Sequence, residues 1–207
     1  MNDQSRKVFE RIYGSAATPK ELPWHRDEPP PLLVKALAAR QGAGNALDIG
    51  CGAGTYSMYM ARRGYKVTGI DFMPQAVEML RKQAAAASLD VTAIQGDITT
   101  WETPEHFDVV LDVGCLHSIG QPRHAVYKKQ LLRWLVPGGD FVLTHLGRRG
   151  WWDRWPVGPN RIGHDTIAAL FQPDLKLKAY EPELLTGMPM FMGRSALVGR
   201  YWFQRVN

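Results

Sequence analysis

The sequence predicts an α/β fold in which helices cover both faces of a seven-stranded, mostly parallel, doubly wound sheet. Three observations support this class. Short apolar runs alternate with helix-compatible segments from residue 45 to residue 146, and right-handed crossovers turn such alternation into a parallel sheet. A glycine-rich turn joins the first run to the helix after it. Two strand-like runs near the end follow each other without a helix, so they must pair as an antiparallel hairpin.

The composition fits one ordinary globular domain. The chain has 207 residues, of which 45% are hydrophobic and 22% charged, enough for one substantial core. The formal net charge is +5, but Lys and Arg are dispersed, which favours a solvated basic surface and no nucleic-acid partner. No apolar run approaches the length of a membrane span, and the amino terminus lacks the apolar core of a signal peptide. We therefore expect a cytoplasmic monomer or homodimer with no membrane partner.

Two cysteines, Cys51 and Cys115, are too few for a disulfide framework, so we expect reduced thiols.

The first 44 residues predict two helices. Residues 5–13 have the apolar spacing of a short amphipathic helix that Gly14 ends, and proline suits the first turn of a second helix over residues 31–40.

The alternating region follows. Apolar runs of four to six residues read as buried strands, and the longer segments with helical periodicity read as helices. The expected strands are the run that closes on Asp48, then Val67–Ile70, Val91–Ile94, Phe107–Asp112 and Phe141–His145. The expected helices cover residues 55–63, 74–87 and 123–135, the last with Val126, Leu131, Leu132 and Leu135 buried. The tail adds a helix over residues 165–171 and the hairpin strands Leu175–Leu184 and Ala196–Val206.

The turn in LDIGCGAGT, residues 47–55, carries the first functional signal. Gly50, Gly52 and Gly54 stand at every second position, where the backbone needs angles closed to other residues and a ligand can approach the main chain. Asp71 ends the next apolar run about 20 residues later, where a Rossmann-like fold places the acid that binds ribose hydroxyls. Together the two signals predict a nucleoside-containing cofactor.

The glycine spacing distinguishes between cofactors. A dinucleotide fingerprint needs a small residue at Thr55 and its third glycine one position later than Gly54. The pattern resembles instead the Asp-x-Gly-x-Gly-x-Gly signature of class I S-adenosylmethionine-dependent methyltransferases. Three further stretches resemble that family in order, namely Gly96-Asp97-Ile98, Phe107–Asp112 and Leu135–Gly139. The resemblance covers roughly residues 45–146 and implies a Rossmann-like fold, S-adenosyl-L-methionine as cofactor and methyl transfer to a small molecule.

The segment before the sheet is similar to that of small, single-domain methyltransferases of the thiopurine- and tellurite-resistance type. In these a Pro-Trp pair precedes a helix, and the tryptophan lies near the methionine moiety of the cofactor. On that resemblance Trp24 is a candidate cofactor residue, and a surface plug beside the prolines is the alternative.

The other candidate cofactor residues lie at the carboxyl ends of the strands, where an open parallel sheet binds its ligand. Asp71 is expected to accept from both ribose hydroxyls and Asp97 from the adenine amino group. Asp48 and the glycine carbonyls would face the amino end of the methionine moiety. Taken singly, Asp71 is also a plausible helix cap and Asp97 a plain turn residue. Phe72 and Met73 are expected to flank adenine. The predicted set of cofactor residues is Trp24, Asp48, Gly50, Gly52, Gly54, Asp71, Phe72, Met73, Asp97, Ile98 and Asp112.

The candidate acceptor site begins at LDVGCLHSI, residues 111–119, which resembles the Asp-Arg-Gly-Cys-Phe-His turn of the same small group. Asp112, Gly114, Cys115 and His117 match that turn, whereas Val113 replaces the arginine and Leu116 the aromatic residue. His117 is the candidate catalytic residue, because an unperturbed pKa of about 6.5 suits a general base near neutrality. A hydrogen bond within the loop is the alternative role for His117. No metal site is predicted.

A loop after the fifth strand contains Trp151, Trp152 and Trp155, which we interpret as a lid that contacts the acceptor. Core packing or a dimer contact would have the same composition.

The single domain thus divides into a capping segment (1–44), a cofactor-binding core (45–146) and a lid loop with helix and terminal hairpin (147–207). Acceptors of the expected kind are thiols, phenols and amines. A non-catalytic S-adenosylmethionine-binding regulator is the alternative function, and an NAD-dependent oxidoreductase is disfavoured.

Overall fold

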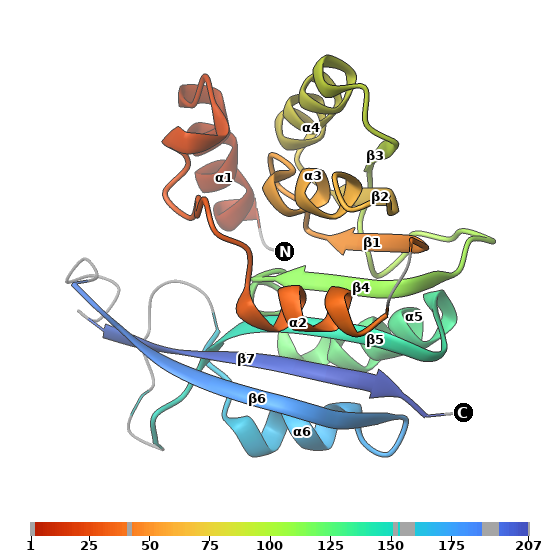
Figure 1. Ribbon diagram of the computed structural model, residues 1–207. Coiled ribbons are helices and arrows are strands. Elements are labelled where there is room, and N and C mark those ends of the chain that lie inside the picture. The colour runs from red at the N-terminus through yellow and green to blue at the C-terminus, as the bar shows by residue number, and fades with distance from the viewer. Residues whose placement is uncertain (1–2, 41–42, 151–152, 154–159, 188–194, 207) are drawn as a thin grey trace.

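One seven-stranded sheet organises the protein, in the strand order β3-β2-β1-β4-β5-β7-β6 (Figure 1). The computed structural model describes residues 3–40, 43–150, 153, 160–187 and 195–206. Strands β1 to β5 are parallel, whereas β7 runs antiparallel to both β5 and β6. This confirms the predicted fold class, including the terminal hairpin. The strands are β1 Asn45–Ile49, β2 Lys66–Asp71, β3 Val91–Gln95, β4 Phe107–Val113, β5 Leu135–Gly147, β6 Leu175–Thr186 and β7 Ser195–Arg205.

Helices cover both faces of this sheet. Apolar side chains of α2, α3 and α4 pack on one face, and those of α5 and α6 pack on the other. The helices are α1 Asp3–Ser15, α2 Pro31–Ala39, α3 Thr55–Ala61, α4 Pro74–Ala87, α5 His124–Trp134 and α6 His164–Phe171, with 3-10 turns η1 Pro19–Glu21, η2 Leu116–Ser118 and η3 Gln121–Arg123. None of the described helices combines the length and apolar character that crossing a membrane requires.

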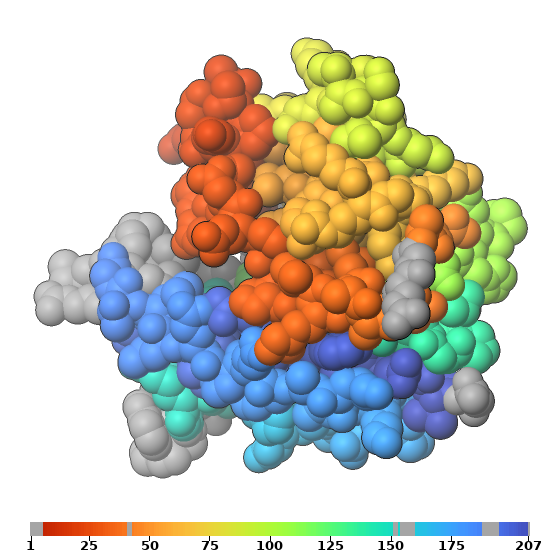
Figure 2. Space-filling model, viewed as in Figure 1, coloured from red at the N-terminus to blue at the C-terminus, as the bar shows by residue number. Residues whose placement is uncertain are grey.

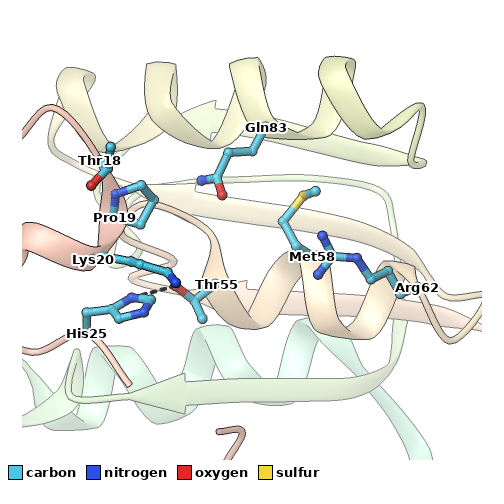
Figure 3. Close-up of a pocket in the computed structure, with 8 residues that line it drawn as sticks. All are labelled: Thr18, Pro19, Lys20, His25, Thr55, Met58, Arg62 and Gln83. Carbon is cyan, nitrogen blue, oxygen red and sulfur yellow. Dashed lines mark hydrogen bonds between the residues drawn. The ribbon is translucent and has the colours of Figure 1, made fainter. Parts of the chain in front are cut away.

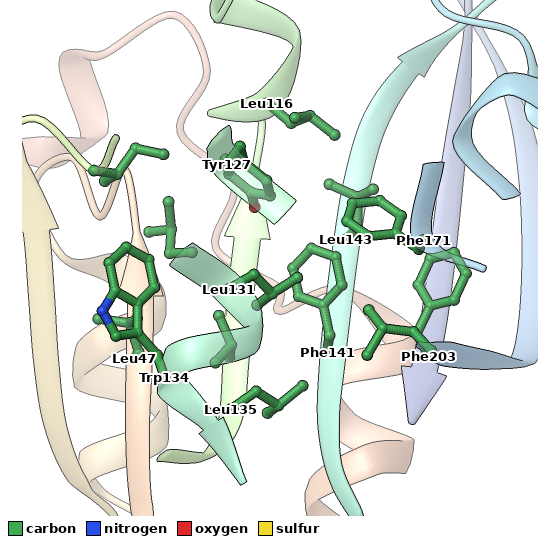
Figure 4. Close-up of a cluster of buried hydrophobic side chains, with 14 of the residues drawn as sticks. Leu47, Leu116, Tyr127, Leu131, Trp134, Leu135, Phe141, Leu143, Phe171 and Phe203 are labelled. Carbon is green, nitrogen blue, oxygen red and sulfur yellow. The ribbon is translucent and has the colours of Figure 1, made fainter. Parts of the chain in front are cut away.

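The largest core cluster lies between the sheet and the α5–α6 layer and is rich in aromatic rings (Figure 4). Tyr127 and Trp134 of α5 are fully buried there. The predicted inner face of this helix is therefore wrong at Val126, which is 43% exposed. The helix turns its larger aromatic side chains inward, because each buries more apolar area than a valine.

Strand β5 begins earlier than predicted, directly after α5. Leu135 pairs with Phe107 and Asp140 with Val109, so residues 136–139 stand against a single residue of β4. The stretch that the sequence predicts as a turn is therefore an interruption within a longer strand. Gly138 has a φ of +72° there, which suits a bulge.

The carboxyl ends of β1, β2 and β4 meet on one side of the sheet, and the capping segment lies over them (Figure 1). In the space-filling view this segment, in red and orange, packs beside α3 and α4 (Figure 2). Tyr13 of α1 and Leu22 share a buried cluster with Met73 and Ala76 at the start of α4. The capping segment therefore packs against the start of α4, beside the glycine turn.

Candidate cofactor and acceptor site

The glycine turn after β1 needs glycine at each of its three positions. Gly50, Gly52 and Gly54 have φ values of +66°, +55° and +88°, which other residues adopt at a cost. A Cβ on Gly54 would lie 2.2 Å from Cδ1 of Leu80. The amide nitrogen of Gly50 donates to the carbonyl of Ile70 at 2.8 Å, so the turn is tied to the end of β2. The result is a rigid loop whose main chain a ligand can approach.

Asp71 binds the glycine turn to the start of α4. Its Oδ2 accepts from the Gly52 amide at 2.9 Å and its Oδ1 from the Met73 amide at 2.8 Å. Burial raises the pKa of this carboxyl, while the bonds from Met73 and Gly52 oppose that rise. Helix α4 has Met73 as its N-cap residue and no side-chain cap, so these bonds fix the turn before α4 and do not cap the helix. Each Asp71 oxygen keeps a lone pair for a ribose hydroxyl. The ribose contact itself stays a prediction.

Aromatic side chains of the capping segment lie over the turn. Tyr13 is 5% exposed, and its hydroxyl lies 3.1 Å from the position that a Cβ on Gly52 would take. Nε1 of Trp24 lies 4.0 Å from the same position, and the two ring centroids are 5.5 Å apart. Phe9 joins Trp24 to Phe72, with centroid distances of 5.4 and 6.1 Å. The predicted residues Trp24 and Phe72 therefore share a cluster with Tyr13, which sequence reasoning missed.

Asp97, predicted to bind adenine, lies in the turn after β3. Its Oδ1 accepts from the amide of Thr99 at 2.9 Å, and its Oδ2 pairs with Arg123 at 2.7 Å. Burial acts to raise the pKa of Asp97, but the bonds from Arg123 and Thr99 outweigh it and lower that pKa. Ile98 is buried beside it. Arg123 was not predicted, and its pairing with Asp97 makes it part of this end of the site.

Two further predicted carboxyls are buried inside the protein. Oδ2 of Asp48 accepts from the Ser57 hydroxyl at 2.6 Å. Asp112 accepts from the amides of Cys115 and Leu116 at 2.7 and 3.0 Å and from the Tyr127 hydroxyl at 2.7 Å. Burial raises the pKa of each carboxyl to about 7. Asp112 therefore shapes the acceptor turn through main-chain bonds, with no exposed surface of its own.

The acceptor turn touches the glycine turn directly. A Cβ on Gly50 would lie 2.8 Å from the Cβ of Cys115, so the two turns are in van der Waals contact. Burial raises the pKa of the Cys115 thiol well above its usual value. Nδ1 of His117 accepts from the amide of Leu146 in β5 at 3.2 Å, and burial lowers the pKa of His117 to about 4. The half-buried His117 is therefore neutral at pH 7.

A second histidine lies behind the first and was not predicted. His145 of β5 is 1% exposed, and its ring centroid is 5.6 Å from that of His117. Neither ring nitrogen of His145 has a hydrogen-bond partner among the residues that the structure describes, which is unusual for a buried polar side chain. Burial lowers the pKa of His145 to about 2, and the neighbouring His117 adds to that shift. In the sequence, His145 is marked only as a histidine within an apolar run, which does not indicate a site residue.

The comparisons with known proteins identify the family. Residues 46–139 match the family model described as a methyltransferase domain. The chain therefore contains a methyltransferase domain. It is 28% identical over 149 residues to the 2-heptyl-1-hydroxyquinolin-4(1H)-one methyltransferase of Mycobacteroides abscessus, covering 69% of this chain and 65% of the relative. It is 34% identical to the ubiquinone biosynthesis O-methyltransferase of Pseudomonas fluorescens, and this match covers 57% of this chain and 52% of the relative.

The matches span about half to two thirds of these two curated relatives. Among solved structures, this chain is similar to the N-methyltransferase NodS from Bradyrhizobium japonicum, which was crystallised with S-adenosyl-L-homocysteine. The TM-score is 0.73 and the identity 22%, and the match covers 99% of this chain and 100% of NodS. It is also similar to TehB from Haemophilus influenzae, with a TM-score of 0.74 and 17% identity, and this match covers 97% of this chain and 66% of TehB. At these identities the two structures establish a shared fold.

The residues of this methyltransferase fit S-adenosylmethionine. The glycine turn offers bare main chain, and Asp71 holds that turn while keeping acceptor capacity for ribose hydroxyls. Tyr13 and Trp24 provide an aromatic cover on the same turn. No three His, Cys, Asp or Glu side chains among the described residues are grouped to hold a metal ion.

A cavity of about 330 Å³ lies on the outer side of the glycine turn, between the capping segment and helices α3 and α4 (Figure 3). His25 and Thr55 meet across it at 3.4 Å, and Gln83 reaches from α4 to donate to the carbonyl of Ala53. None of the predicted cofactor residues lines this cavity. The predicted cofactor residues of the glycine turn lie instead beside Tyr13 and Trp24.

The predicted lid residues Trp151, Trp152 and Trp155 lie outside the described residues. Asp153, which stands among them, is described and is 5% exposed. It pairs with Nε of Arg149 at 3.0 Å and with Arg161 at 2.5 Å, and Arg149 also donates to Ser195. This ion cluster joins the end of β5 to the start of β7 in the methyltransferase.

Proposed function

We propose that this methyltransferase moves the methyl group of S-adenosylmethionine to a heteroatom of a small organic acceptor. The observation that carries the proposal is the contact between the cofactor turn at Gly50 and the acceptor turn at Cys115. The contact supports a site in which the methionine end of the cofactor would lie beside the turn that ends β4. The named activities of the quinolone and ubiquinone relatives, both methyltransferases, support a small-molecule acceptor.

The chain's residues would act mainly by binding and orienting. Asp71 would hold the ribose, Asp97 and Ile98 the adenine ring, and Asp48 with the glycine carbonyls the amino end of the methionine moiety. The bound cofactor supplies an electrophilic methyl group on a sulfonium. Methyl transfer is an in-line displacement, so orientation and exclusion of water provide most of the rate. Tyr13 is buried over the glycine turn and packs against Trp24, which supports that exclusion.

We further propose a cytoplasmic monomer or homodimer that does not act on nucleic acid. Dispersed basic residues on a chain of modest net charge support this. The test of function is turnover of labelled S-adenosylmethionine with a panel of thiols, phenols and amines. Titration with S-adenosylhomocysteine and with NAD separates the cofactor classes. Binding of S-adenosylhomocysteine without turnover of any acceptor would favour a non-catalytic regulator.

Replacing Trp24 by alanine is expected to weaken binding of S-adenosylhomocysteine about three- to tenfold. The substitution removes an aromatic surface from above the glycine turn and leaves Tyr13 and Phe9 with one fewer packing partner. Isothermal titration measures the change. Trp24→Phe keeps most of the ring contact and should bind nearly as the wild type does. Equal affinity of wild type and Trp24→Ala would show that Trp24 is a surface plug.

A further inference from the structure

The hydrogen bond from Leu146 determines which nitrogen of His117 bears the proton. A main-chain N–H is always a donor, so Nδ1 of His117, which accepts it at 3.2 Å, presents a lone pair. The neutral ring therefore has its hydrogen on Nε2. Protonation of Nδ1 would set two N–H groups against each other and is disfavoured. His117 can thus donate from Nε2 but cannot accept a proton there.

The Nε2 atom of the same ring lies beside Gly114 of the acceptor turn. The nearest main chain is Gly114, which has a φ of +92° and no side chain. A Cβ on Gly114 would lie 3.1 Å from Nε2, so any other residue there would cover it. No described residue forms a hydrogen bond with Nε2, although His117 is only half-buried. Within the described part of the chain, the geometry therefore leaves one N–H at the end of β4 without a hydrogen-bond partner.

Among the described residues, the carboxyls and the other histidines near the turn are buried or already hydrogen-bonded, including Asp71 and Asp97. Asp112 has no exposed surface and accepts three hydrogen bonds, and Asp48 is 2% exposed. His145 is 1% exposed, and His124 is 7% exposed with its Nε2 on the carbonyl of Ile119. The residues around Asp153 and between the hairpin strands that the structure does not describe include no Asp, Glu or His in the sequence. An acceptor must therefore lose its proton before it binds.

We propose that His117 donates its Nε2–H to the methyl-accepting atom and that the enzyme selects acceptors that arrive as anions, such as thiolates and acidic phenolates. This rests on the proposed function and replaces the base role predicted for His117. A lone pair of the acceptor anion forms the bond to the methyl carbon as the carbon–sulfur bond breaks, and that electron pair stays on the sulfur of the neutral thioether product. No proton moves in the step. Donation from a neutral imidazole stabilises and orients the anion without protonating it.

Nitrogen-15 NMR of the ring nitrogens tests the assignment without any acceptor. With histidine labelled in the full chain, we expect His117 at pH 7 to show a protonated Nε2 and an unprotonated Nδ1; a His117→Gln sample identifies its signals. A His117 ring with its proton on Nδ1, or a charged ring, would overturn the proposal. This outcome does not depend on whether the protein methylates anything in the panel.

The kinetic test uses thiophenol, 4-nitrophenol, phenol and benzyl alcohol at saturating cofactor. We expect the pH midpoint of the single-turnover rate to follow the ionisation of each acceptor, in wild type and variants alike, and benzyl alcohol to be unreactive. His117→Leu should lower the plateau rate at least tenfold, whereas His117→Gln, whose amide can donate, should recover most of it. A midpoint shared by all acceptors and lost in both variants would mean that His117 is a base. If S-adenosylhomocysteine binds but no acceptor reacts, the proposed function fails while the NMR result still decides the role of His117.

Discussion

Asp71→Ala is expected to weaken binding of S-adenosylhomocysteine at least tenfold. If Asp71 holds both ribose hydroxyls, the substitution removes two charge-assisted hydrogen bonds of roughly 1.5–3 kcal/mol each. It also removes the bonds that tie the Gly52 and Met73 amides together, so the glycine turn loses its support at the same time. The two effects act in the same direction, and the loss should be among the largest for a single site in this protein.

Isothermal titration at pH 7 measures this loss, with circular dichroism confirming that the variant is folded. Asp71→Asn keeps one oxygen acceptor and should give an intermediate affinity. Asp90→Ala is a matched control, because Asp90 is an exposed carboxylate just before β3 and far less buried than Asp71. Unchanged affinity in a folded Asp71→Ala protein would mean that Asp71 serves only to tie the glycine turn to the turn before α4.

His145→Leu is expected to stabilise the protein by about 1–3 kcal/mol at pH 7. The native side chain is buried with two unpartnered nitrogens, and a buried polar group without hydrogen bonds carries a desolvation cost of that order. Leucine of similar size removes the cost and adds apolar contact to the neighbouring core. Urea unfolding of wild type and variant measures the difference.

The gain should grow as the pH falls. Because burial lowers the pKa of His145 from about 6.5 to about 2, the unfolded chain binds a proton below pH 6.5 that the native state does not. That linkage destabilises the wild type as pH falls from about 6.5, by at most about 1.4 kcal/mol per pH unit, and the variant lacks it. His106→Leu, at an exposed histidine, should show no such gain. A pH-independent difference would mean that His145 titrates normally in the folded protein.

Local signals in the sequence were sufficient for the sheet and the glycine turn. Positive φ at Gly50, Gly52 and Gly54 is a demand that short-range sterics impose, so the turn was predictable from its letters. Alternation of apolar runs with helical segments predicted the parallel strands, and the missing crossover helix predicted the terminal hairpin. The inner face of α5 was misjudged, since counting apolar residues gave Val126 the same weight as the aromatic Tyr127.

The remaining site features depend on contacts between distant segments. Tyr13 covers Gly52 only because α1 docks on the carboxyl ends of the strands, and an amphipathic pattern does not say where a helix docks. Arg123 meets Asp97 across two loops for the same reason. The sequence indicated His117, but its protonation state is determined by the amide of Leu146, 29 residues later in a neighbouring strand. Its role could not be read from the turn alone.

The aromatic cover over the glycine turn has a kinetic consequence. Tyr13 and Trp24 lie over the glycine turn, so if the cofactor binds there as proposed, we expect it to enter and its product to leave only when the capping segment moves away. Association should then be slower than the usual 10⁵–10⁷ M⁻¹s⁻¹ for docking, and its observed rate should reach a plateau at high ligand concentration. The same opening step would limit departure of S-adenosylhomocysteine. Steady-state turnover would then be slower than a single turnover, and the first cycle would appear as a burst of methylated product.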